Sequence, residues 1–473
     1  MWTRILLAII AVIVVATGAF VAYAWEPALA PVQTPDPASF DAGLKQRGTD
    51  LARLGNCNVC HVGVGDARQD GKAFAGGRAL PTPFGTIYAT NITPDPDTGI
   101  GSWSEGTFAR AMHEGVDQQG RHLYPAFPYD HFTKLSDDDV KALYAFLMTR
   151  EPVAAKTPAN ELPFPLNIRL AIAGWKLVFF HKGRFQPDAN HDEAWNRGAY
   201  LADAVAHCGA CHTPRNSLGA RQQHRTFAGG SSEGWDAPAL NAESPTPVPW
   251  NADSIFAYLR NGSVPLHGAA AGPMIPVVRN LAQVPEEDTR AIATYVASIA
   301  GTPTPERQRR ADELIAKLNQ RDREAVGHGA PPGAGAAPGR EAAERSGAGR
   351  DTAARETVGL SGTSQQPASP IFAGACAQCH SETRPHGAAG AINLSLSTAV
   401  NLPDPRNAIR IVRDGLHPPA GERGALMPGF ADVFSDAQIA ELLAYVRARF
   451  SSAPAWSDLD GRVRRIGEGK DNS

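Results

Sequence analysis

The hydrophobic pattern of the chain begins with an uncharged apolar run over residues 5–25, directly after Arg4. At a rise of about 1.5 Å per residue, a helix over this run is about 31 Å long, close to the ~30 Å hydrocarbon layer of a membrane. We therefore expect residues 1–30 to hold a membrane anchor. Small residues at positions 22–24 and 28–30 leave a cleaved signal peptide as the alternative. In either case Arg4 is expected in the cytoplasm and the body of the chain outside it.

Further along, apolar residues recur at the spacing of an α-helix in a series of short segments. The segments follow a repeated order: a leading helix, a loop, a helix that ends at a glycine, and a final apolar helix. The predicted helices cover residues 39–54, 103–114, 136–148, 191–206, 250–261, 285–299, 404–414 and 435–450. The middle helices end at Gly115, Gly262 and Gly415, a common residue type at this position. The pattern predicts an all-α protein.

Two short stretches of sequence are repeated along the chain. Arg47-Gly48 in the first predicted helix returns as Arg197-Gly198 in the leading helix of the second set. Downstream, the tetrapeptide Phe-Ala-Gly-Gly at residues 74–77 returns at residues 227–230. Because the repeats keep the same order relative to the helices, the first two units are predicted to be duplicates of one another.

All six cysteines fall into three copies of one pentad, Cys-x-x-Cys-His. The copies contain Cys57, Cys60 and His61, then Cys208, Cys211 and His212, then Cys376, Cys379 and His380. Two thiols on one helical turn can each form a thioether to a haem vinyl group, and the next imidazole then lies under the iron. Disulfides or a four-thiolate zinc site are the alternatives, but three pairs do not fit one tetrahedral zinc site. The pentads therefore predict three covalently bound haem c groups.

The pentads and the repeated helix order predict three cytochrome c-like domains, each wrapped around one haem. These domains cover residues 38–155, 189–302 and 369–452. Residues 156–188 form an apolar connector that either packs between domains or provides an interfacial or partner-binding surface. Residues 303–368 begin with a charged helical stretch and continue as a Gly-, Ala- and Pro-rich segment, so a flexible linker is expected. Residues 453–473 are polar and are expected to form a loose tail.

His61, His212 and His380 are the predicted proximal ligands, and a low-spin haem iron needs a second axial ligand on its other face. Met274 and Met427 each lie 12 residues after the glycine that ends the preceding helix, in a proline-rich loop. A methionine that merely fills a gap in a core would not explain this equal spacing. Met274 and Met427 are therefore predicted as the sixth ligands of the second and third haems.

The first unit departs from this pattern, because the position 12 residues after Gly115 is Phe127, and phenylalanine cannot coordinate iron. Met112 is the leading substitute, since it lies on the helix expected to face the distal side of the haem. Met148 is expected in the core. A histidine ligand and an open, five-coordinate iron are the alternatives. The candidate histidines are His113, His122 and His131.

Charge and motifs argue against several other functions. The formal net charge of −3 gives no basic surface for nucleic acid. The sequence has no nucleotide-binding glycine fingerprint, phosphate-binding loop or nucleophile elbow. The three aspartates at 137–139 follow Ser136 and indicate a capped helix start rather than an acid–base pair. The chain is therefore predicted to move electrons and not to be an enzyme itself.

With these motifs the chain resembles the tri-haem cytochrome c subunits of membrane-bound bacterial dehydrogenases. The resemblance covers nearly all of residues 40–450 except the linker, and it rests on the pentads together with residues 80–95 and 120–126. The quinoprotein alcohol dehydrogenase and gluconate dehydrogenase branches carry methionine where this chain has Phe127. Phe127 with Met112 is more similar to the branch that serves molybdopterin hydroxylases, such as nicotinate, isoquinoline and periplasmic aldehyde oxidising enzymes.

The resemblance implies a subunit on the periplasmic side of the inner membrane that passes electrons from a dehydrogenase catalytic subunit to ubiquinone or a terminal oxidase. It favours a molybdopterin-dependent partner, with a small iron–sulfur subunit as a further candidate. A quinoprotein alcohol dehydrogenase or a flavin gluconate dehydrogenase is the alternative partner. Two further hypotheses stay open at this point: a haem enzyme or gas sensor with an open first haem, and a stand-alone carrier between respiratory complexes.

Overall fold

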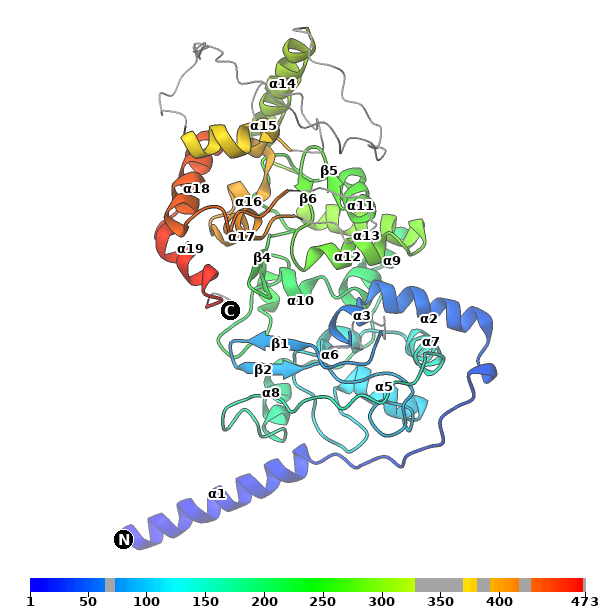
Figure 1. The fold of residues 1–473 in the computed structure, drawn as a ribbon. Helices are drawn as coiled ribbons and strands as arrows, with labels where there is room; N and C mark the ends of the chain where they lie inside the picture. Colours follow the sequence, from blue (N-terminus) through cyan, green and yellow to red (C-terminus); the bar gives the residue numbers. More distant parts are fainter. Residues whose placement is uncertain (64–72, 328–368, 381–391, 417–426, 471–473) are drawn as a thin grey trace, which may run out of the picture.

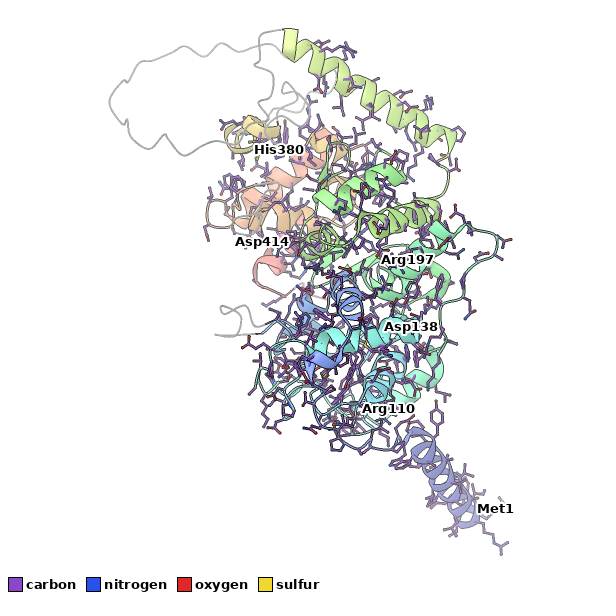
Figure 2. All side chains as sticks on the ribbon, turned by 90° about the vertical axis from the view of Figure 1, so that its right-hand side faces the viewer. Met1, Arg110, Asp138, Arg197, His380 and Asp414 are labelled. Atoms are coloured by element: carbon purple, nitrogen blue, oxygen red, sulfur yellow. The ribbon has the colours of Figure 1, made fainter. Side chains whose placement is uncertain are left out.

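The computed structural model describes residues 1–63, 73–327, 369–380, 392–416 and 427–470. Figure 1 shows three helical units that follow one another, with a long helix, α1 (Trp2–Ala24), projecting from the first unit. Among the described residues, α1 is the helix that is long and apolar enough to cross a membrane. In Figure 2, Met1 at the far end of α1 and His380 in the third unit lie at opposite ends of the molecule.

The first unit is built on two closely packed helices, α2 (Ala42–Leu54) and α7 (Asp137–Met148). They approach each other at Gly48, where a Cβ would lie 2.0 Å from the carbonyl oxygen of Ala142. The Nε of Arg47 is 2.9 Å from an oxygen of Asp139, in the first turn of α7. The other elements of this unit are η1 (Pro37–Ser39), α3 (Cys57–Cys60), β1 (Ala79–Thr82), β2 (Gly85–Tyr88), α5 (Glu105–Glu114) and α6 (Tyr129–Phe132).

The second unit repeats this arrangement with α9 (Glu193–Tyr200) packed against α13 (Glu286–Ala300). A Cβ at Gly198 would lie 2.0 Å from the carbonyl oxygen of Ala291, and Arg197 is 2.9 Å from Asp288. The repeated Arg-Gly pair therefore marks the same helix contact in both units. The other elements are η2 (Leu201–Val205), α10 (Gly209–His212), η3 (Gln223–Arg225), β3 (Gly230–Ser232), β4 (Trp235–Ala237), α11 (Ala252–Asn261), β5 (Ser263–Val264), β6 (Gly268–Ala269) and α12 (Met274–Leu281).

The first two units share one hydrophobic core. Leu51 and Leu143 from the first unit belong to the same buried cluster as Leu201 and Ile292 from the second. An ion pair spans the two units as well, because Arg47 also lies 3.9 Å from Asp288. The duplicated units are therefore packed against each other.

The third unit has a core of its own. Its elements are η4 (Phe372–Cys376), α15 (Ala377–His380), η6 (Leu394–Leu396), α16 (Thr398–Asn401), α17 (Arg406–Asp414), α18 (Asp436–Phe450) and α19 (Leu459–Gly467). The last of these corrects the prediction of a loose tail. Leu459, Val463 and Ile466 are spaced to share one face of α19, and all three are buried against the core of this unit.

The described residues also contain short strands, which an all-α prediction does not include. Three antiparallel hairpins pair β1 with β2, β3 with β4, and β5 with β6. The repeated Phe-Ala-Gly-Gly forms the turn that leads into the first two hairpins, with positive φ at Phe74, Gly76, Phe227 and Gly229. The backbone carbonyls of His61 and His212 accept hydrogen bonds from Gly76 and Gly229, both at 3.0 Å. The repeat therefore fixes each hairpin beside its pentad.

Two helices lie between the units. α8 (Ala171–Phe179) comes from the apolar connector and packs against α1. α14 (Pro305–Gly327) forms over the charged stretch at the start of the predicted linker. Ala311 and Leu318 of α14 are buried against Val248 of the second unit and Leu396 of the third, so this part is a packed helix and not a flexible linker. Residues 328–368 of the predicted linker lie outside the described residues.

Candidate functional site

Each pentad forms one helical turn. α3 has His61 as its C-cap, whereas α10 and α15 end at His212 and His380. The structure describes all six cysteines, and none of them forms a disulfide with another. Burial raises the pKa of Cys57 and of Cys208 to about 12, so these two thiols are protonated at neutral pH.

The three pentad histidines are held in the same way. Each ring Nδ1 lies within hydrogen-bond distance of a backbone carbonyl oxygen: that of Thr90 for His61 (2.6 Å), Pro238 for His212 (2.7 Å) and Ile392 for His380 (3.1 Å). A carbonyl oxygen only accepts, so Nδ1 carries the proton and Nε2 keeps a free lone pair. Burial lowers the pKa of all three imidazoles, although the carbonyl contacts act in the opposite direction. The result is a neutral imidazole with Nε2 available to a metal.

One continuous cavity of about 2230 Å³ runs along the three units. A pocket for a single drug-sized ligand has about 300–1,000 Å³, so this cavity is large enough for more than one cofactor. All of the predicted cysteine, histidine and methionine ligands line it. These are Cys57, Cys60, His61 and Met112, then Cys208, Cys211, His212 and Met274, then Cys376, Cys379, His380 and Met427. Thiols, a neutral imidazole and a thioether around one apolar cavity are the groups that haem c requires, so the residues present fit this cofactor.

The loops that carry the sixth-ligand positions correspond between the first two units. After α5, the amide of Leu123 donates to the carbonyl of Gly115 (2.8 Å), and after α11 the amide of Ala270 donates to that of Gly262 (2.7 Å). Phe127 lies four residues after Leu123, and Met274 lies four residues after Ala270. In the third unit, Met427 and Leu416 exchange two backbone hydrogen bonds of 2.9 Å. Phe127 therefore occupies the place of the methionine in the duplicate.

Met112 is the predicted substitute for the methionine that the first unit lacks at position 127. It comes from α5, is 5% exposed and lines the cavity together with His61 and Phe127. Met148 does not line the cavity; it is fully buried in α7, as expected for a core residue.

The three candidate histidines are engaged elsewhere, and none of them lines the cavity. His113 Nδ1 accepts from Arg184 (2.7 Å). His122 Nε2 donates to the carbonyl of Ala24 (2.8 Å), and its Nδ1 accepts from Lys176 (3.1 Å). His131 Nδ1 lies 2.5 Å from the carbonyl oxygen of Asp203.

The first two attachment turns lie against each other, a relationship that the sequence did not reveal. His207, the residue before Cys208, contacts the carbonyl of Gly55 at 3.1 Å. Asn280 donates to the side-chain oxygens of Asn56 (2.8 Å) and Asn58 (3.1 Å). Each contact joins residues at least 152 positions apart, and no local motif marks them. The sequence does carry a signal for the acids that pair with Arg47 and Arg197. Asp139 and Asp288 are each the third residue of their helix.

The comparisons with known proteins identify the family. A family model described as cytochrome c oxidase, cbb3-type, subunit III matches residues 365–446. The chain is 33% identical over 446 residues to the fructose dehydrogenase cytochrome subunit of Gluconobacter japonicus, covering 92% of this chain and 85% of that protein. It is also 33% identical over 426 residues to the gluconate 2-dehydrogenase cytochrome c subunit of Pantoea cypripedii, covering 86% of each. The chain belongs to this family of dehydrogenase cytochrome c subunits.

A further relative of this cytochrome subunit is a nicotinate dehydrogenase subunit of Pseudomonas putida, 42% identical over 447 residues. The match covers 93% of the present chain but 33% of that protein, so the cytochrome subunit spans about a third of its length. The family carries haem c covalently, and the cytochrome subunit is an electron-transfer subunit rather than a catalytic one. These comparisons confirm the predicted family and the predicted role in electron transfer.

Proposed function

We propose that this cytochrome subunit holds three haem c groups, one at each pentad, and carries electrons from a dehydrogenase catalytic subunit to an acceptor at the membrane. The observation that supports this proposal is the single cavity lined by all three pentads and by Met112, Met274 and Met427. Because the three attachment turns line one cavity, haems bound there would lie close to one another, which favours a relay of electrons.

The chain supplies both the attachment and the axial ligands. The two cysteines of each pentad would hold the haem through thioether bonds. His61, His212 and His380 would bind the iron through Nε2, because the carbonyls of Thr90, Pro238 and Ile392 orient their rings through Nδ1. When bound, each haem supplies a one-electron couple whose potential depends on its axial ligands. Met274 and Met427 are the sixth ligands of the second and third haems. Met112 takes this role in the first unit, where Phe127 has no donor atom.

The relatives support one class of electron donor over another. The identity to the nicotinate dehydrogenase subunit, 42%, exceeds the 33% identity to the fructose and gluconate dehydrogenase subunits. Together with Phe127, this favours a molybdopterin-dependent partner that oxidises an aromatic heterocycle or an aldehyde and that works with a small iron–sulfur subunit. A quinoprotein alcohol dehydrogenase or a flavin gluconate dehydrogenase is the alternative donor.

We further infer that α1 is retained as an anchor and holds the units on the periplasmic side of the inner membrane, where ubiquinone or a terminal oxidase accepts the electrons. Two contacts at the end of α1 and just after it support its retention. His122 donates to the carbonyl of Ala24, and Arg110 donates to that of Pro27 at 2.7 Å. Cleavage near residues 24–30 would remove partners that the first unit already binds.

The test is a count of haem iron in the purified full-length chain. We expect three irons and porphyrin that stays bound after denaturation, and two irons in a Cys376→Ala/Cys379→Ala variant. Fewer than three irons in the wild-type chain would overturn the proposal. Purification from native membranes tests the partner: a large dehydrogenase subunit should accompany the chain, whereas a chain that purifies alone would support a stand-alone carrier.

A further inference from the structure

The outward face of α8 and the loop before it is apolar, although the segment contains charged residues. Between residues 162 and 180 the charges are Arg169 and Lys176. Both point inward. Lys176 is 7% exposed and donates to the carbonyls of Glu114 and Gly115, both at 2.7 Å. Arg169 donates to the carbonyl of His122 at 3.1 Å and lies over the Tyr124 ring.

The residues that face outward are apolar. Leu177 is 65% exposed, and its neighbour Val178 is 62% exposed. Phe164 and Ile168 from the preceding loop are 79% and 45% exposed. Leu218 of the second unit, 59% exposed, joins them because Trp175 donates from its indole nitrogen to the Leu218 carbonyl (2.9 Å). We call these five residues the α8 patch: Phe164, Ile168, Leu177, Val178 and Leu218.

This arrangement of side chains is the reverse of that in a surface helix whose outer face is in water. A solvated helix turns lysine outward and buries leucine and valine, whereas α8 buries its lysine and exposes Leu177 and Val178. Groups of exposed apolar side chains of this kind mark surfaces that are covered by lipid or by another protein. The element that lies beside the α8 patch indicates whether lipid or another protein covers it.

The neighbour of α8 is the candidate membrane helix. A Cβ at Gly174 of α8 would lie 3.5 Å from the ring of Phe20 in α1. Phe20 is four residues before the end of α1 at Ala24, which places this contact about 6 Å below the end of the helix at 1.5 Å per residue. Amphipathic helices that lie on membranes bury their apolar face about 5–10 Å into the boundary between headgroups and acyl chains. The depth of α8 along α1 agrees with that range.

Hydrogen bonds fix the position of α1 relative to the first unit. The depth of α8 along α1 therefore does not depend on the contact with Phe20 alone. Arg110, labelled near the base of α1 in Figure 2, donates to the carbonyl of Pro27. The amide of Leu29 donates to the carbonyl of Gln118 at 2.8 Å. Charged residues resume directly after the patch, where Lys182 pairs with Glu114 (2.9 Å) and Arg184 with Asp137 (2.8 Å). These pairs mark the edge of the apolar surface.

We propose that the α8 patch lies in the interfacial layer of the same membrane that α1 spans. This inference rests on the proposed anchoring role of α1. It gives the first unit two attachments, a spanning helix and an embedded surface, so that the unit is held against the bilayer rather than tethered to it. Ile172 and Trp175 of α8 also line the cavity, so the cavity wall in the first unit faces the lipid.

The test measures the depth of single positions in the membrane. The six native cysteines are occupied by haem in the loaded protein, so one introduced cysteine can be labelled with an environment-sensitive NBD fluorophore. The variants are Val178→Cys in the patch, Val12→Cys in α1, and Val433→Cys as the matched control, since Val433 is 65% exposed in the third unit. The full chain is reconstituted without partner subunits in phosphatidylethanolamine/phosphatidylglycerol vesicles, and quenching by iodide and by doxyl-labelled lipids is compared.

We expect the probe at 178 to show blue-shifted emission, loss of iodide quenching and quenching by shallow doxyl lipids, and the probe at 433 to remain open to iodide. If the probe at 12 is in lipid but the probe at 178 is quenched by iodide, the inference is wrong while the anchor stands. If the probe at 12 is also in water, the anchor itself is wrong. Protection of position 178 that requires an added dehydrogenase partner would overturn the inference in favour of a protein interface.

Discussion

Arg78 and Glu233 form an ion pair, with Nη2 and Oε2 2.7 Å apart, across the junction of the first two units. Arg78 also donates to the carbonyl of Val59, inside the first pentad, at 2.7 Å. Glu233 lies at the tip of the β3–β4 hairpin. Burial raises the pKa of the Cys60 thiol, Arg78 lowers it, and Glu233 raises it. Both charges therefore act on the Cys60 thiol at the first attachment site.

Replacement of Arg78 by Gln is expected to lower the midpoint potential of the first haem. Loss of a positive charge favours the oxidised, more positive form of the iron site. The pair is partly exposed, with side-chain exposures of 25% and 36%, so its interaction is modest. A partly exposed charge interacts with another charge by about 0.2–1 kcal/mol, and an interaction of this size between Arg78 and the haem corresponds to a shift of about 10–40 mV for one electron. Spectroelectrochemical titration of the purified chain measures the shift.

The sign of this effect can be checked with two further variants. Glu233→Gln should raise the same potential, and the double variant should lie close to the wild type because the two charge changes compensate. Arg309→Gln is a suitable control, since Arg309 pairs with Glu313 on the exposed face of α14. A potential that moves in the same direction in both single variants would contradict an electrostatic role.

The same hairpin also contacts the third unit. Asp236 and Asn407 exchange two hydrogen bonds of 2.8 Å between the backbone of the first residue and the amide of the second. Arg410 donates to the carbonyl of Gly234 at 2.6 Å. The hairpin β3–β4 of the second unit therefore contacts both the first and the third unit.

Met112→Leu is expected to open the first haem. Leucine keeps the volume and loses the sulfur, so the iron there becomes five-coordinate and its potential falls. In carbon monoxide difference spectra of the reduced protein, the wild type should be silent and the variant should show one reactive haem. Met148→Leu is the matched control, because Met148 is buried in α7 away from the cavity. A wild-type chain that already binds carbon monoxide would instead support an open first haem.

Many of the helices could be predicted, because the sequence signals that mark them are local. The helices predicted at 103–114, 136–148 and 435–450 begin within two residues of α5, α7 and α18. Ser104, Ser136 and Ser435 each accept a hydrogen bond from a backbone amide of the first turn, as N-caps do. The pentads are equally local, since five neighbouring residues hold the chemistry.

The features that sequence did not reveal depend on distant pairs or on weak patterns. Arg78 and Glu233 are 155 positions apart, and Asp236 and Asn407 are 171 apart. The sequence predicts a loose tail because its composition is polar, and the charged residues Arg462, Arg464 and Arg465 lie between the apolar residues of α19 and obscure its apolar face. The sequence does not predict the hairpins, because strands of only two to four residues are too short to show a clear alternation of apolar and polar positions.

Gly48→Ala is expected to destabilise the shared core of the first two units. The added methyl group would meet the Ala142 carbonyl at 2.0 Å, so α2 and α7 must separate. Overpacking of this kind costs about 1–3 kcal/mol of unfolding free energy. Gly198→Ala should have a similar effect at the contact of α9 with α13. Gly183→Ala serves as the control, because no atom lies within 4 Å of the new methyl group. Urea unfolding followed by circular dichroism distinguishes these variants.

Lys176 leads to a prediction on pH. Burial lowers the pKa of its ammonium to about 7 from the usual 10.5, and nearby Lys182 lowers it further, against the smaller opposite effects of Glu26 and Glu114. The unfolded chain holds this proton up to about pH 10.5, whereas the folded chain holds it only up to about pH 7. In this window the unfolded state binds more protons, so stability rises with pH.

Lys176→Met should remove this dependence. The unfolding free energy of the wild type is expected to increase from pH 7 to pH 9, and that of the variant is expected to increase less, as measured by urea unfolding at three pH values. The pKa of His122, which contacts Lys176, is lowered by burial below its usual 6.5, so His122 does not titrate in this range. Lys141→Met is the control, because Lys141 is exposed on α7 and is not among the charges that shift the pKa of Lys176, so this variant should keep the wild-type slope. Equal slopes in the wild type and in Lys176→Met would show that the buried lysine keeps its charge throughout.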